Sequence, residues 1–163
     1  MEYDSKADTL EHMKMVAFDM HRVICEIIHR IEIHDKGKLQ PEEKSIFDEY
    51  TPRLKGVTFG SPEYRQFLNE MKPALDHHYA TNRHHPEFFP DGIRGMNLLD
   101  MIEMICDWHA SSKRHADGDP LKSIEINQKR FGYSDEMKQV FINTMRWVSG
   151  SETLKYDNRA SKI

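Results

Sequence analysis

The segment between residues 77 and 87 is rich in side chains that bind metals. It holds four of the ten histidines of the chain and one glutamate, namely His77, His78, His84, His85 and Glu87. Histidine is the commonest metal ligand, and so dense a group of imidazoles is costly to keep together unless something binds them. We expect His78, His84 and His85 to bind a metal ion or a phosphate. Glu87 would orient a ligand imidazole or act as a general acid or base. The alternative is a set of helix-end histidines bonded to carbonyl groups, with the glutamate facing water.

A second group of candidate residues comprises His34, Asp35 and Lys38. It follows the first predicted helix, and at a helix end an imidazole and a neighbouring carboxylate can both reach one metal ion or two adjacent ions. The carboxylate can bridge two cations, whereas the imidazole binds one. Lys38 lies about one helical turn further along and can place a positive charge on a phosphate oxygen. These three residue types favour a metal site that handles a phosphate group.

A third group lies on a strongly apolar helix predicted near residues 96–114, which we expect to be buried on every side. Five polar residues there are spaced by three or four positions and share one helix face: Asp100, Glu103, Asp107, Ser111 and Arg114. Carboxylates on a dry helix must be paired, hydrogen-bonded or bound to metal. We expect Asp107 to be the metal ligand of this face. The alternative is a set of caps and of salt bridges with Arg53, Lys113 or Arg114.

The elements that must position these groups are all predicted to be helices. Helical periodicity recurs along the chain, and the alternation typical of strands is nearly absent. We expect six helices, near residues 10–31, 41–54, from 61 onward with a kink or restart at Pro73, 96–114, 121–131 and 136–148. Residues 86–95, with two prolines and two glycines, should form a loop. The prediction is therefore an all-α domain over residues 1–149 with a polar tail over 150–163.

The composition limits what this domain can bind and where it works. The chain has 163 residues, 38% of them hydrophobic and 31% charged, with a net charge of −4. It contains no basic block, so duplex nucleic acid is excluded as the expected partner. It contains no apolar run of the roughly 20 residues that a membrane span needs, and no signal peptide is expected at its N-terminus. Cys25 and Cys106 lie in apolar helical patterns, which predicts buried thiols in a reducing cytoplasm. Apolar residues left exposed on a small helical domain make a homodimer the expected assembly.

The ordered combination of these motifs resembles the HD-domain metal-dependent phosphohydrolases, whose motif is His…His-Asp…Asp. The segment His34-Asp35-x-Gly-Lys38 is similar to the central His-Asp of that superfamily. The segment His84-His85-Pro86-Glu87 resembles part of its HD-GYP branch, although the Gly-Tyr-Pro itself is missing, so a cyclic dinucleotide substrate is not implied. The whole chain also resembles a family of small phage and bacterial proteins without a settled function, which carry the same elements in the same order.

Two further ligands are implied by this resemblance. Asp107, with Arg114 after it, resembles the closing Asp helix of the superfamily, and His12 resembles its leading His. In one straight helix, however, His12 and His34 would lie about 33 Å apart. The resemblance therefore requires a turn near residues 22–26, although neither glycine nor proline marks one there.

Together these observations predict a metal-dependent phosphohydrolase that acts on a nucleotide or another small phosphate ester. The expected ligands of one or two divalent metal ions are His12, His34, Asp35, His78, His84, His85 and Asp107. Mixed histidine and carboxylate ligands suit Mn²⁺, Fe²⁺, Co²⁺ or Zn²⁺. Lys38 and Arg114 would neutralise charge on the transferred phosphoryl group.

Three alternatives stay open at the level of sequence. Two irons held by histidines and carboxylates on helices could activate oxygen instead of hydrolysing an ester. A non-catalytic, metal-stabilised protein could bind a nucleotide or a host protein, as a phage factor would. A purely structural domain would fold and bind its partners unchanged after removal of metal.

Overall fold

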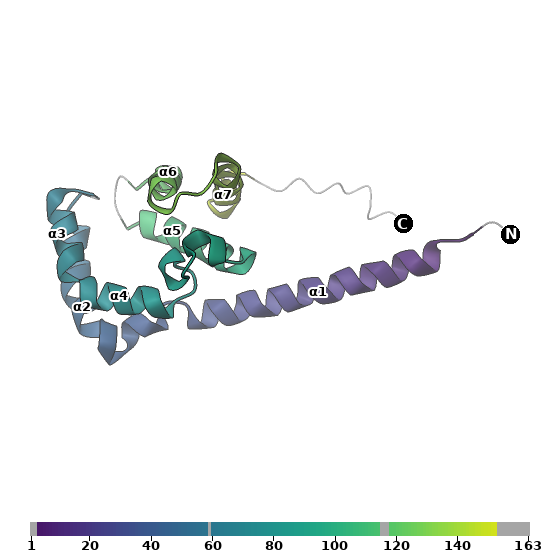
Figure 1. Ribbon diagram of the computed structural model, residues 1–163, viewed down its shortest axis with the longest axis horizontal. Coiled ribbons are helices and arrows are strands. Elements are labelled where there is room, and N and C mark those ends of the chain that lie inside the picture. Colours follow the sequence, from purple (N-terminus) through teal and green to yellow (C-terminus); the bar gives the residue numbers. More distant parts are fainter. Residues whose placement is uncertain (1–2, 59, 115–117, 153–163) are drawn as a thin grey trace. The chain divides into compact units, whose positions relative to one another are not determined.

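The computed structural model describes residues 3–58, 60–114 and 118–152 (Figure 1). The chain divides into two compact units, Met1–Lys36 and Gly37–Ile163. The sequence predicted one domain over residues 1–149, whereas the structure groups the first 36 residues apart from the rest. Of the predicted polar tail, residues 153–163 lie outside the described part of the chain. No described helix combines the length and the apolarity needed to cross a membrane.

The first unit consists of one long helix and the turn that ends it. Helix α1 runs without interruption over Lys6–Ile33, a length of 28 residues (Figure 1). The turn expected near residues 22–26 was therefore wrong, because nothing in that stretch interrupts helical hydrogen bonding. The 22-residue separation of His12 and His34 along this helix corresponds to about 33 Å. The two histidines of one chain cannot bind the same ion.

Helix α1 ends in an unusual backbone conformation. The N–H of His34 still donates to the carbonyl of Arg30, over 2.8 Å. Asp35 then adopts φ = 57°, the left-handed region. Asparagine and aspartate are among the few residues that enter this region at modest cost, because their short polar side chains bond locally. The His-Asp pair thus stops the helix and changes the direction of the chain.

The second unit contains six α-helices and three short 3₁₀ turns in its described residues. The helices are α2 (Pro41–Lys55), α3 (Pro62–Glu70), α4 (Lys72–Thr81), α5 (Leu98–Ser112), α6 (Pro120–Phe131) and α7 (Asp135–Val148). The 3₁₀ turns are η1 (Lys36–Leu39), η2 (Pro86–Phe88) and η3 (Gly92–Gly95). The all-α prediction is confirmed, with seven described α-helices in place of six. The extra one arises because Pro73 lies in the first turn of α4, where its missing N–H is tolerated.

Helices α5, α6 and α7 enclose the main core of the second unit. The buried side chains of this core are Ile93, Met96, Met104, Ile105, Trp108, Ile124, Tyr133, Phe141 and Met145. The ring of Trp108 stacks on that of Phe131 and meets the ring of Phe141 edge-on. This packing holds α5 in place, and α5 carries several of the candidate site residues.

Burial of α5 is one-sided, which corrects two expectations. Leu98 and Ile102 are exposed, so the helix is not buried all round as its composition suggested. Cys106 is also exposed, as is Cys25 on α1, although the sequence predicted buried thiols. Cys106 follows Met104 by two positions, so on a helix it points about 200° away from that core residue.

Candidate metal centre

Three histidines from the segment singled out in the sequence converge in the second unit. His78 lies in the last turn of α4, and His84 and His85 follow that helix. Their imidazoles offer ligand atoms that all lie within 4.8 Å of one another. The ring centroids are 5.8 Å apart for His78 and His84, 4.9 Å for His78 and His85, and 4.1 Å for His84 and His85. His78 is 1% and His84 2% exposed, and His85 is half-buried.

The end of α4 explains why residues six positions apart meet. Asn82 caps the helix with an extended backbone, and its N–H donates to the carbonyl of His78. The N–H of His85 then donates to the carbonyl of Asn82, over 3.1 Å. The chain therefore turns back at the helix end and brings His84 and His85 over the last turn. Pro86, which opens η2, fixes the direction that follows.

Glu43, in the first turn of α2, holds two of the four clustered histidines. Its carboxylate is fully buried and has one oxygen 2.8 Å from Nδ1 of His77 and the other 3.0 Å from Nδ1 of His78. Because a carboxylate accepts hydrogen bonds, the ring nitrogen that faces it carries the hydrogen. In a neutral ring this leaves the lone pair on Nε2. Glu43 thus sets the tautomer in which His78 can bind a metal.

Glu103 on α5 plays the same part for His84. Its Oε1 lies 3.2 Å from Nδ1 of His84, so that Nε2 is again the nitrogen that keeps its lone pair in the neutral ring. The Nε2 atoms of His78, His84 and His85 are all buried. A carboxylate that orients an imidazole from the rear is the common arrangement around metal-binding histidines. His78 and His84 have it.

Gly37 leaves room for this arrangement. A Cβ at that position would lie 3.0 Å from Oε1 of Glu43, closer than most real contacts. Glycine therefore allows the backbone of η1 to approach the carboxylate that holds His77 and His78.

The donor set fits a divalent transition metal. A zinc–nitrogen bond of about 2.0–2.1 Å places the ligand atoms of one ion roughly 3–3.5 Å from each other. The ligand atoms of the three imidazoles already lie within 4.8 Å of one another, so a small further approach would bring them to that separation. Imidazole nitrogen suits zinc, copper, iron and nickel, whereas calcium and magnesium prefer an all-oxygen site.

The other predicted ligands are placed differently. Asp107 is half-buried on α5, one turn beyond Glu103, and its carboxylate is not part of the histidine group. His34 and Asp35 belong to the first unit, where Nε2 of His34 lies 3.7 Å from Oδ2 of Asp35. His12 belongs to the same unit, at the far end of α1.

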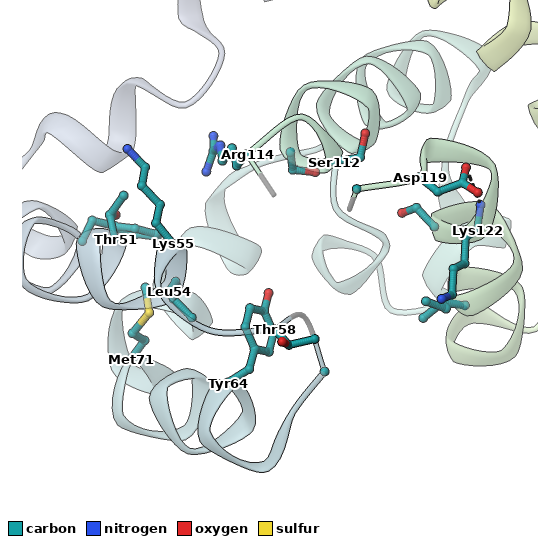
Figure 2. A pocket seen from close by; sticks show the side chains of 16 residues that line it. Thr51, Leu54, Lys55, Thr58, Tyr64, Met71, Ser112, Arg114, Asp119 and Lys122 are labelled. Carbon is teal, nitrogen blue, oxygen red and sulfur yellow. Dashed lines mark hydrogen bonds between the residues drawn. The ribbon is translucent and has the colours of Figure 1, made fainter. Parts of the chain in front are cut away.

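The predicted catalytic residues all lie in the second unit. The ammonium of Lys38 lies 5.2 Å above the centre of the Phe47 ring. Glu87, in η2, forms a 2.5 Å ion pair with Arg130. Arg114 follows α5 and lines a pocket of about 490 Å³ (Figure 2).

Sequence reasoning missed the role of Glu43 and undervalued that of Glu103. An acid just after Pro41 is what any helix start favours, so nothing local distinguishes Glu43. Asp100, by contrast, serves as a cap and a salt-bridge partner, the alternative that the sequence offered for this helix face. It accepts two 3.1 Å hydrogen bonds from Arg83 and forms the capping box of α5 with Asn97. Arg83 was not among the partners that the sequence suggested for this helix face.

Searches among curated proteins and among solved structures found no significant match to this chain. One family model does match, and it covers residues 1–150, which include every candidate residue described above. The model is that of a family of unknown function, DUF5662. Because the match spans more than nine tenths of the chain, the protein belongs to the DUF5662 family.

Proposed function

We propose that this protein is a metal-dependent phosphohydrolase that acts on a nucleotide or another small phosphate ester. The observation that carries the proposal is the group of three imidazoles, two of them backed by the carboxylates of Glu43 and Glu103. Carboxylates commonly orient metal-binding imidazoles in this way. The phosphate ester is favoured by the cationic pocket that adjoins the group and by the resemblance to HD-domain enzymes.

The side chains would divide the work as follows. His78, His84 and His85 bind a divalent metal through Nε2, while Glu43 and Glu103 fix the orientation of two of the rings. By the resemblance to HD-domain enzymes, His34 and Asp35 stay predicted metal ligands. A metal ion bound there supplies a water of lowered pKa and holds phosphoryl oxygens.

The remaining predicted residues act on charge and position. Arg114 and Lys38 neutralise negative charge on the phosphoryl group. Glu87 acts as a positioning residue: it pairs with Arg130, whose guanidinium lies 5.9 Å from the centre of the Tyr79 ring. That ring in turn lies 4.7 Å from the ring of His85. The chain of contacts restricts where His85 can move.

The test is the metal content of the purified, tag-free protein by elemental mass spectrometry. One or two equivalents of transition metal are expected in the wild type, and less in the His84→Ala and Asp35→Ala variants. His109→Ala is the matched control, because it removes a partly buried histidine of α5 outside the group. Absence of bound metal after loading with Mn²⁺, Fe²⁺ or Zn²⁺ would sink the proposal.

Turnover is tested separately with a panel of nucleoside monophosphates and other phosphate esters, by release of inorganic phosphate. Release that depends on metal and disappears in His84→Ala is the expected result. A protein that holds its metal but hydrolyses none of these esters is not a phosphohydrolase. That outcome would favour a metal-stabilised binding protein, and oxygen uptake by an iron-loaded, coloured protein would favour the di-iron alternative.

A further inference from the structure

The pocket lined by Arg114 lies wholly in the second unit and has one wall in common with the histidine group. Its lining comes from α2, from α3 and the residues around it, from the end of α5 with Arg114 after it, and from the start of α6 (Figure 2). Phe47 lines the pocket and also meets the ring of His78 edge-on, with the centroids 6.0 Å apart. A molecule in this pocket would therefore lie next to the candidate metal centre.

The charges of the pocket are strongly one-sided. Its described lining includes three cations, Lys55, Arg114 and Lys122, and one carboxylate, Asp119. That carboxylate already caps α6, accepting from the N–H groups of Leu121 and Lys122. An excess of positive charge gathers here in a chain whose net charge is −4.

Several other cations of the second unit form ion pairs. Lys44 pairs with Asp48, Arg53 with Glu49, and Arg130 with Glu87. In the part of the chain that the structure describes, no carboxylate comes within ion-pair distance of Lys55, Arg114 or Lys122. Figure 2 shows Lys55 and Arg114 on one side of the pocket and Lys122 across from them, with the Tyr64 hydroxyl directed between the two sides. Cations that face one cavity from two walls favour an anion inside it.

The rest of the lining suits a molecule with an apolar body. Phe47, Leu54 and Met71 supply apolar surface, and Thr51 and Ser123 supply hydroxyls. Burial and the nearby Tyr79 raise the pKa of Tyr64, against the influence of Arg130 and Arg114. Its hydroxyl therefore stays a hydrogen-bond donor at neutral pH. A volume of about 490 Å³ is within the range of roughly 300–1,000 Å³ of pockets that enclose small organic ligands.

We propose that this pocket binds a small phosphate monoester with an apolar or aromatic body, of the size of a nucleoside monophosphate. The phosphate contacts Lys55, Arg114 and Lys122, and the body packs on Phe47, Leu54 and Met71. This inference rests on the proposed function in naming the class of substrate, but binding itself needs neither metal nor turnover.

The experiment is isothermal titration calorimetry with the phosphonate analogue of adenosine 5′-monophosphate, in which a methylene group replaces the ester oxygen and prevents hydrolysis. We expect one-to-one binding to the protein as purified. Lys55→Ala and Lys122→Ala should each weaken it about tenfold, the loss of one charge-assisted contact. Lys44→Ala, which removes the same charge from an ion pair on α2, should leave affinity within about twofold. Adenosine, which has no phosphate, should bind at least about tenfold more weakly than the analogue.

Three results would overturn the proposal: no binding of the analogue, equal affinity in the wild type and both lysine variants, or equal affinity for adenosine. Circular dichroism of each variant confirms that it is folded, and these exposed lysines support no core packing. The outcome is separable from that of the hydrolase proposal. Binding of the analogue to a protein without metal or turnover supports the pocket alone, and bound metal with turnover but no effect of the lysine variants supports the hydrolase alone.

Discussion

Glu43 and Asp100 are both fully buried carboxylates, and the difference between their partners separates a candidate site residue from a structural one. Asp100 accepts hydrogen bonds from the guanidinium of Arg83 and from the backbone N–H of Asn97. Both groups are donors only, and neither has a lone pair that could bind a metal. Glu43 is held by two imidazoles. An imidazole that donates from one nitrogen keeps a lone pair on the other. Of these two carboxylates, therefore, Glu43 is the one that orients a candidate metal ligand.

Replacing Glu43 by glutamine should weaken metal binding by roughly 10–100-fold, the usual effect of removing a group that orients a ligand. The amide keeps the shape of the side chain but replaces one acceptor with a donor, so it can accept only one of the two hydrogen bonds that His77 and His78 donate. Competition with a chelator measures the affinity. Glu42→Gln is the control, since Glu42 is the exposed neighbour on the same helix. Equal affinity in Glu43→Gln and the wild type would contradict the role given to Glu43.

Tyr64 should titrate above its ordinary pKa of 10.0, because burial and Tyr79 disfavour the phenolate. Because the pKa of Tyr64 is higher in the folded than in the unfolded protein, its neutral phenol stabilises the fold. This contribution is fully present below the pKa of the unfolded state and is lost as pH rises through the pKa of the folded state. The difference in absorbance at 295 nm between the wild type and Tyr64→Phe isolates this one phenol during an alkaline titration. A midpoint at or below pH 10.0 would show that the hydroxyl is not shielded.

At the scale of elements, α5 links the candidate site to the core. Its buried face packs in the core through Met104 and Trp108, and its polar face carries Glu103. The capping box between Asn97 and Asp100 fixes where the helix begins, and so the register of every residue after it. If α5 began at another residue, the carboxylate of Glu103 would be displaced from His84.

The cap of α5 should contribute measurably to folding. Asn97→Ala removes the acceptor for the N–H groups of Leu99 and Asp100, and we expect it to lower the free energy of unfolding by about 1 kcal/mol. Chemical denaturation measures the change. Asn143→Ala, an exposed position in the middle of α7, should change stability by less than about 0.5 kcal/mol. Similar values for the two variants would mean that the cap is not what fixes the start of α5.

At the scale of the whole molecule, the first unit has a surface that it cannot bury by itself. Its described part contains one helix, and apolar residues such as Met13, Met20, Ile24 and Ile27 recur along α1 at helical spacing. An apolar face of this kind is usually buried against another surface, because its exposure to water is unfavourable. The homodimer expected from the sequence stays a prediction, and this stripe is the surface that it would use.

We predict that the wild type is a dimer by light scattering and that Ile24→Lys shifts it toward monomer. A lysine in the dimer interface would lose the hydration of its ammonium group, which is unfavourable without a paired charge. His29→Lys also adds a charge to α1, but on another face of the helix, and should leave the dimer intact. A wild type that is monomeric at every concentration would exclude this assembly.

Removal of metal should destabilise the folded protein, because an ion bound only by the native state adds to its stability. With free metal a hundredfold above the dissociation constant, chelation should lower the free energy of unfolding by about 2.7 kcal/mol. Thermal denaturation with and without chelator measures the effect. The His78→Gln variant should show no difference between the two conditions. An unchanged melting temperature in the wild type would mean that the histidines hold no ion in the folded state.

The sequence by itself determined the all-α class, most helix boundaries and the segment in which the histidines gather. These properties are local. Pro41, Pro62 and Pro120 open helices, and the spacing of the apolar residues indicates helical structure. Only the tertiary structure decided which carboxylates hold the histidines, since Glu43 and His78 are 35 residues apart and meet only because α2 packs beside α4. It also decided that α1 continues without a turn near residues 22–26, since no residue in that stretch indicates whether the helix continues or breaks. Contacts between distant residues depend on how helices pack, and no local pattern of residue types encodes that.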